Sequence, residues 1–169
     1  MDSTLRDGEQ TPGVSFTPAE KLQIVRFAVN HLRIDRMEIG SSRVSEGEFS
    51  GVSAVLEWAA AKDCLAAMEI LGFLDGGKSA RWIKNAGGKT LNLLVKGSEA
   101  HCRGQLRMTP AEHAVRVQRE IETAVDMGLA VNLYLEDWSG GMRNSLGYVL
   151  GLISNVKAKT AFRQNSSLS

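Results

Sequence analysis

The stretch TLNLLVKGSEAHCRGQLRMTPAEHAVRVQREIETAVDMGLAVNLYL, residues 90–135, decides the fold class. It begins and ends with short apolar runs of strand length, at 90–95 and 129–135. Between them, TPAE at 109–112 marks a helix start, with Thr at the N-cap, Pro at the first helical position and Glu three residues after the cap. A strand, a helix and a second strand in this order predict a βαβ unit with parallel strands.

The same alternation extends upstream. Apolar runs predict strands at 32–39 and 67–73, and the opening residues up to Leu5 are expected to supply one more. TPAE recurs at 17–20 and predicts a second capped helix. Further helices are predicted over 53–62, 79–85 and 145–155. About five strands alternating with five helices indicate an α/β fold, which the pattern leaves open between a doubly wound sheet and part of a barrel.

Bulk composition excludes several classes of protein. The chain has 169 residues, a net charge of +1 and 43% hydrophobic residues, close to a soluble globular average. No basic stripe or membrane-length apolar run occurs, so neither nucleic acid nor a membrane is an expected partner. Cys64 and Cys102 lack metal-ligand spacing and indicate a cytoplasmic protein. We expect one domain over 1–158 and a disordered tail over 159–169.

The segment LRDGEQ, residues 5–10, lies where the first strand is expected to end. In parallel α/β folds, catalytic groups gather at the carboxyl ends of the strands. Arg6 beside Asp7 places a fixed cation next to a hard oxygen ligand, which suits a divalent metal and a developing oxyanion. On the residues alone, a solvated charged loop is the structural alternative.

Longer segments carry a family resemblance. LRDGEQTPGVSF, residues 5–16, closely resembles the opening signature of the acetyl-CoA-dependent 2-oxo acid condensing enzymes, namely the isopropylmalate, homocitrate and citramalate synthases. It is shared more loosely with hydroxymethylglutaryl-CoA lyases. Later segments resemble that family's strand ends, in order: DRMEIG (35–40), RVSEGE (43–48), LGFLDGG (71–77), KGS (96–98) with His101, LEDW (135–138) and MRNS (142–145). The resemblance covers residues 3–158 and implies about the first five βα units of a (β/α)8 TIM barrel.

The resemblance also implies a function and a site. The function is an acyltransferase that condenses acetyl-CoA with a 2-oxo acid, as 2-isopropylmalate synthase does in leucine biosynthesis. Asp7 would bind Mg²⁺, Mn²⁺ or Zn²⁺, and Arg6 would offset negative charge on the attacked oxo group. The implied residues are, for catalysis, Arg6, Glu38 and Glu136; for substrate binding, Gln10, Ser98 and His101; and for the metal, Asp7.

Each of these residues has a plainer interpretation. Glu38 could pair with Arg36 or Arg43 at the surface instead of orienting Arg6. Glu136 could belong to a solvated turn, and His101 could be a surface residue after a strand. The strand-end positions that the resemblance assigns favour the functional interpretation for Glu38.

The chain also departs from the family pattern. A barrel of this kind has eight strands and roughly 250 residues, and the family's His-x-His metal pair does not occur in the sequence. Asn92 stands where some members have a histidine. We therefore expect a chain that is inactive alone and that forms a homo-oligomer or aggregates through open sheet edges. A lyase of the hydroxymethylglutaryl-CoA kind and a non-catalytic interaction module remain alternatives.

Overall fold

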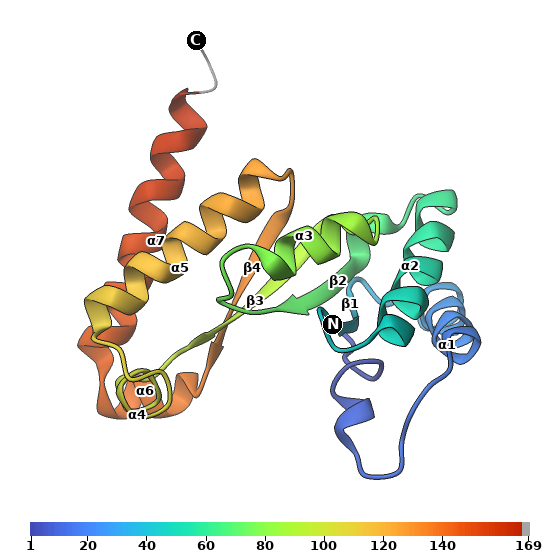
Figure 1. Cartoon of the computed structure of the whole chain (residues 1–169), viewed down its shortest axis with the longest axis horizontal. Helices are drawn as coiled ribbons and strands as arrows, with labels where there is room; N and C mark the ends of the chain where they lie inside the picture. Colours follow the sequence, from blue (N-terminus) through green and yellow to red (C-terminus); the bar gives the residue numbers. More distant parts are fainter. Residues whose placement is uncertain (167–169) are drawn as a thin grey trace.

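A parallel sheet lies at the centre of the fold in the computed structural model (Figure 1). The structure describes the backbone of residues 1–166 and the side chains of residues 1–156. The strands of the sheet are β1 (Met37–Ser41), β2 (Met68–Gly72), β3 (Thr90–Lys96) and β4 (Ala130–Glu136). They lie side by side in chain order, β1-β2-β3-β4, and every pair is parallel. Consecutive parallel strands joined through helices are the arrangement of successive units of a (β/α)8 barrel, which confirms the predicted fold class.

Helices connect the strands, and the two TPAE segments begin helices as predicted. The helices are η1 (Gly8–Gln10), α1 (Pro18–Asn30), α2 (Glu46–Ala61), η2 (Leu65–Ala67), α3 (Lys78–Asn85), α4 (Glu99–Gly104), α5 (Pro110–Asp126), α6 (Trp138–Asn144) and α7 (Leu146–Ser166). Thr17 and Thr109 each form a complete capping box with the Glu three residues later. Each box satisfies amide groups that the first helical turn leaves unpaired.

The bounds of several elements differ from the prediction. The strand predicted at 32–39 begins five residues later, as β1 at Met37–Ser41. α2 begins seven residues earlier than predicted because the Ser45 hydroxyl caps it by accepting the Glu48 amide. The short helices α4 and α6 follow β3 and β4 directly and were not predicted. α7 extends to Ser166, and the prediction of a disordered tail over 159–169 stays a prediction. Residues 167–169 of the predicted tail lie outside the described residues.

The prediction of a strand ending at Leu5 is wrong. Only Asp2 pairs with the sheet, through an isolated parallel bridge to Met37. The chain turns immediately afterwards, because the Asp2 carboxylate accepts the Thr4 amide and the Ser3 carbonyl accepts the Asp7 amide. Leu5 is fully buried, so the apolar signal reflects core packing. The described chain therefore has a four-stranded sheet in place of the predicted five strands.

The core lies between the sheet and its helices. Alternate strand residues on this face are at most 1% exposed: Met37, Ile39, Met68, Ile70, Leu91, Leu93 and Val95. They pack against buried side chains of the helices, among them Val52, Ile83 and Val117. Because side chains alternate across a strand, the polar residues between them face the other side of the sheet. No helix of the described chain is long and apolar enough to cross a membrane.

Candidate active site on the inner face of the sheet

The face of the sheet opposite the helices carries a row of polar side chains. The strand register pairs Glu38 with Glu69 and Lys96 with Glu136. Asn92 lies between them and is fully buried. In a barrel this face points inward, so the register brings residues distant in sequence to one surface.

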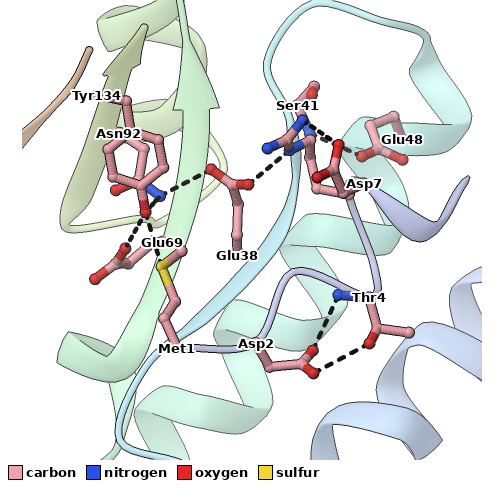
Figure 2. Close-up of polar contacts among 11 residues, drawn as sticks. Met1, Asp2, Thr4, Asp7, Glu38, Ser41, Glu48, Glu69, Asn92 and Tyr134 are labelled. Carbon is pink, nitrogen blue, oxygen red and sulfur yellow. Dashed lines mark hydrogen bonds and ion pairs between the residues drawn. The ribbon is translucent and has the colours of Figure 1, made fainter. Parts of the chain in front are cut away.

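Arg6 is the centre of the first group of contacts, and its partners Glu38 and Asp7 are labelled in Figure 2. Its Nε donates to Glu38 Oε2 at 2.6 Å, and its Nη1 donates to Asp7 Oδ1 at 2.8 Å. The other oxygen of Glu38 accepts from Asn92 Nδ2 at 2.9 Å. Glu38 is 0% exposed, and a buried carboxylate is stable only when cations and donors satisfy it. Glu38 therefore restricts the orientation of the Arg6 guanidinium; the catalytic roles of both residues stay predictions.

The plainer interpretation of Glu38 does not describe its contacts. Arg36 pairs with Glu69 through two of its nitrogens, and Arg43 pairs with Asp75 at 2.8 Å. The carboxylate of Glu38 therefore interacts with Arg6 and Asn92 and with neither Arg36 nor Arg43.

Tyr134 and Asn132 extend this network across the sheet, and sequence reasoning did not single them out. Asn92 Nδ2 lies 2.9 Å from the Tyr134 hydroxyl, and Asn132 Nδ2 donates to Asn92 Oδ1 at 3.0 Å. Burial, followed by the negative charges of Glu69 and Glu38, raises the pKa of Tyr134 to about 12. Tyr134 therefore keeps its hydroxyl proton at neutral pH. The signal that could have found it is the alternation of 132, 134 and 136 along one strand.

Four of the predicted site residues line one open hollow of about 700 Å³. They are Arg6, Asp7, Gln10 and Glu136. Tyr134 and Trp138 form more of its wall, together with Leu94, Leu133 and Leu135. The hollow thus joins a cation, two carboxylates, an amide and an apolar surface, which suits a small polar molecule with an apolar substituent.

The other two predicted substrate contacts lie beside this hollow. His101 Nδ1 is 4.0 Å from Glu136 Oε1, and His101 Nε2 is 3.9 Å from Asp137 Oδ2. Ser98 is only 2% exposed, and its hydroxyl caps α4 by accepting the His101 amide. Ser98 therefore positions His101 at the start of α4 and does not line the hollow.

A buried lysine holds the loop that carries Asp7 and Gln10. Lys21 Nζ contacts Glu9 Oε2 at 2.7 Å and Glu48 Oε2 at 2.6 Å. The second oxygen of Glu9 accepts the Phe16 amide, and that of Glu48 accepts the amide of Ser41, the last residue of β1. One ammonium thus links the loop to β1, α1 and α2.

The predicted metal ligand, Asp7, does not lie in a complete metal site among the described side chains. Asp7 is 56% exposed on its side chain, and one of its oxygens already accepts from Arg6. No group of three or more His, Cys, Asp or Glu residues among the described residues is arranged to hold a metal. The residues present therefore do not by themselves fit a resident divalent ion, which takes several oxygen or nitrogen ligands.

The parallel strands follow one another in chain order, which defines part of a (β/α)8 barrel. The hollow beside the ends of β3 and β4 is its candidate site. Comparison with known proteins gives the family. The chain belongs to the HMGL-like family, whose model matches residues 1–163.

Named relatives lie in one group of enzymes. The chain is 36% identical to "Putative (R)-citramalate synthase CimA" of Methanopyrus kandleri over 88% of its length, and 32% identical to 2-isopropylmalate synthase of Polynucleobacter asymbioticus over 92%. It is 36% identical to homocitrate synthase of Pyrococcus abyssi over 81%. It spans only 28%, 29% and 36% of these relatives.

One solved structure shows the same fold. The crystal structure of the HMG-CoA lyase from Brucella melitensis matches with a TM-score of 0.50 and 20% identity. The match covers 79% of this chain and 47% of the lyase. At this identity the likeness supports the fold alone.

Proposed function

We propose that this chain supplies the Arg–carboxylate part of an acyltransferase site that condenses acetyl-CoA with a 2-oxo acid, in the manner of the citramalate, isopropylmalate and homocitrate synthases. The observation that carries the proposal is the fixed guanidinium of Arg6, held by buried Glu38 at the edge of a hollow. Relatives named as synthases match most of the chain. The enzyme is proposed to act in the cytoplasm.

Arg6 has the chemistry that this condensation needs. When the acetyl carbon attacks the oxo carbon, the oxo oxygen gains negative charge, and a preorganised cation lowers the energy of that state. Glu38 and Asn92 prevent the guanidinium from reorienting during the reaction. Gln10 is proposed to donate to the substrate carboxylate, and Glu136, near His101, to handle protons or water at the same hollow.

Metal binding is proposed only as a contribution from Asp7. One of its carboxylate oxygens is not engaged by Arg6, and the side chain reaches the hollow. Further ligands would have to come from residues outside the described part of the chain, or from a second copy in a homo-oligomer. For the 169-residue chain alone we accordingly propose binding of the oxo acid without turnover.

Two measurements test the proposal. Saturation-transfer NMR with a panel of 2-oxo acids should detect binding to the wild-type chain, and Arg6→Met should abolish it. Arg103→Met is the matched control, because Arg103 is an exposed arginine on α4 paired with Glu99. A chimera that places residues 1–156 into the Polynucleobacter asymbioticus relative should release free thiol from acetyl-CoA when an oxo acid is present, and Arg6→Met should lower that rate about 100-fold or more.

Three outcomes would reject the proposal. Equal oxo acid binding by the wild type and Arg6→Met would remove the role of the guanidinium. A correctly folded chimera that cleaves an acyl-CoA but condenses no oxo acid would favour a lyase, whereas one without either activity would favour a non-catalytic module.

A further inference from the structure

Lys96 is a charged residue of the inner face that the proposed function has not used. It is the last residue of β3 and stands opposite Glu136, the last residue of β4, in the strand register. Its ammonium contacts Glu136 Oε2 at 2.5 Å. The Lys96 side chain is 17% exposed and that of Glu136 is 37% exposed. The ion pair is therefore shielded on the lysine side, while its carboxylate borders the hollow.

The backbone on both sides of this pair is held in place. The carbonyl of Lys96 accepts the Tyr148 hydroxyl from α7 at 2.8 Å, and that hydroxyl lies 2.8 Å from His113 Nδ1. Because the hydroxyl has one proton, which it gives to the carbonyl, His113 Nδ1 must carry the hydrogen of the second bond. Tyr148 and His113 are thus positioning residues for the end of β3.

Two glycines allow the corners after β3 and β4 to touch. A Cβ on Gly97 would lie 2.8 Å from the Glu136 carbonyl, and a Cβ on Gly141 would lie 2.0 Å from the Gly97 carbonyl. The Gly97 amide donates to the Glu136 carbonyl at 2.6 Å. The two strand ends are therefore held in contact, which keeps the Cα atoms of Lys96 and Glu136 opposite one another.

The charges around the hollow explain why this pair matters. Arg6 already contacts two carboxylates, Asp7 and Glu38. Among the described side chains, Lys96 is the sole Lys or Arg paired with Glu136, and His101 is the remaining neighbour, at 4.0 Å. Without Lys96, an anionic ligand entering the hollow would face the carboxylate of Glu136 without its paired cation.

We propose that Lys96, fixed by the Tyr148–His113 contacts, neutralises Glu136 and so makes this hollow accessible to small carboxylate anions. The inference rests on the proposed function in one respect: a 2-oxo acid is such an anion. It adds a residue that sets the charge selectivity of the site.

Quenching of Trp138 fluorescence measures this selectivity directly. Trp138 lines the hollow and is 40% exposed, and replacing Trp58 and Trp82 by Phe leaves it as the sole tryptophan of the chain. In that background, iodide reports access by an anion and acrylamide reports access by a neutral molecule. Lys96→Met should lower the ratio of the iodide to the acrylamide quenching constant about twofold or more, since local charge controls the local anion concentration.

Three variants make the test specific. Lys96→Met/Glu136→Gln should restore the ratio, because it removes the uncompensated carboxylate together with the ammonium. Glu136→Gln alone should raise the ratio, and this arm stands even if Lys96→Met fails to fold. Lys89→Met removes an exposed lysine just before the amino end of the same strand and should leave the ratio unchanged.

An unchanged ratio in Lys96→Met or in Glu136→Gln would overturn the inference, as would a loss in Lys96→Met that the double variant does not recover. This readout needs no substrate. A chain with the expected quenching pattern that binds no 2-oxo acid would keep the inference and remove the proposed function. Oxo acid binding without the quenching pattern would do the reverse.

Discussion

The two edge strands of the sheet, β1 and β4, differ in how the side chain of a glutamate is surrounded. Glu38 on β1 is 0% exposed and is held by Arg6 and Asn92, whereas the Glu136 side chain on β4 is 37% exposed and pairs with Lys96. Every residue of β2 is buried, while those of β4 are exposed or half-buried. The difference follows from the neighbours of each strand. β1 lies between β2 and the bridge at Asp2, but β4 has only β3 beside it in the described chain.

This contrast indicates that the two glutamates have different roles in the candidate site. A carboxylate with neighbours on every side is a fixed partner that orients a cation. A carboxylate at an open strand remains available to a ligand. The β1 side therefore supplies rigidity, and the β4 side supplies access.

The largest expected effect tests the rigid side. Glu38→Ala removes the buried partner of Arg6 and one of the two acceptors of the Asn92 amide, so we expect a loss of about 3–5 kcal/mol in the free energy of unfolding. Glu136→Ala, at the open strand, should cost about 1 kcal/mol or less. Urea denaturation of both variants measures the difference. Similar losses for the two would break the comparison.

The contact between the strand ends should be the next most sensitive feature. Gly141→Ala places a Cβ against the Gly97 carbonyl and should destabilise the chain by about 1–3 kcal/mol, because the backbone must shift. Gly147→Ala is the control, since a Cβ there meets nothing within 4 Å and Gly147 lies in α7. Alanine there should stabilise by up to about 1 kcal/mol. Thermal unfolding distinguishes the two signs, and equal shifts would contradict the proposed contact.

Tyr148→Phe tests how α7 holds the β4 side. It removes the donor to the Lys96 carbonyl and the partner of His113. Leaving these buried groups unpaired should cost about 1–3 kcal/mol. Hydrogen exchange should show faster opening at the ends of β3 and β4 while β1 and β2 keep their protection. Uniform acceleration across all four strands would show that the two sides do not differ.

The smallest effect is a pH dependence at His113. Burial, and then the charge of Lys96, lowers the pKa of His113. Below about pH 6.5, the ordinary pKa of a histidine, the imidazole of His113 is protonated in the unfolded chain but stays neutral in the folded chain. The free energy of unfolding therefore falls as the pH falls. Between pH 6.5 and 5.5 the loss should be up to about 1 kcal/mol.

His113→Gln should flatten this part of the stability profile in urea denaturation at each pH. His31→Gln, at an exposed helix end, should keep the wild-type slope. The same slope in His113→Gln and in the wild type would assign the acid sensitivity to other groups.

Much of the fold was predictable, because local signals agree with the tertiary structure at most elements. The strands predicted at 67–73, 90–95 and 129–135 correspond to β2, β3 and β4, and both TPAE helices begin at the predicted caps. The strand prediction at Leu5 failed because an apolar residue can be buried in a turn as well as in a strand. α4 and α6 are too short to show helical periodicity.

The candidate site was predictable in part. The resemblance placed Arg6, Asp7, Gln10 and Glu136 together, and the structure brings these four to one hollow; their functional roles stay predictions. The Glu38–Asn92 and Lys96–Glu136 contacts could not be predicted, because they depend on which residues stand opposite one another in adjacent strands.

The sequence by itself determined the alternation of strands and capped helices, and hence a parallel sheet, because helical periodicity and capping are local properties of the chain. The tertiary structure alone decided which carboxylates are enclosed and which are accessible. That outcome depends on strand register and on the number of neighbours around each strand. Neither can be read from a short segment of sequence, because both involve contacts between residues far apart in the chain.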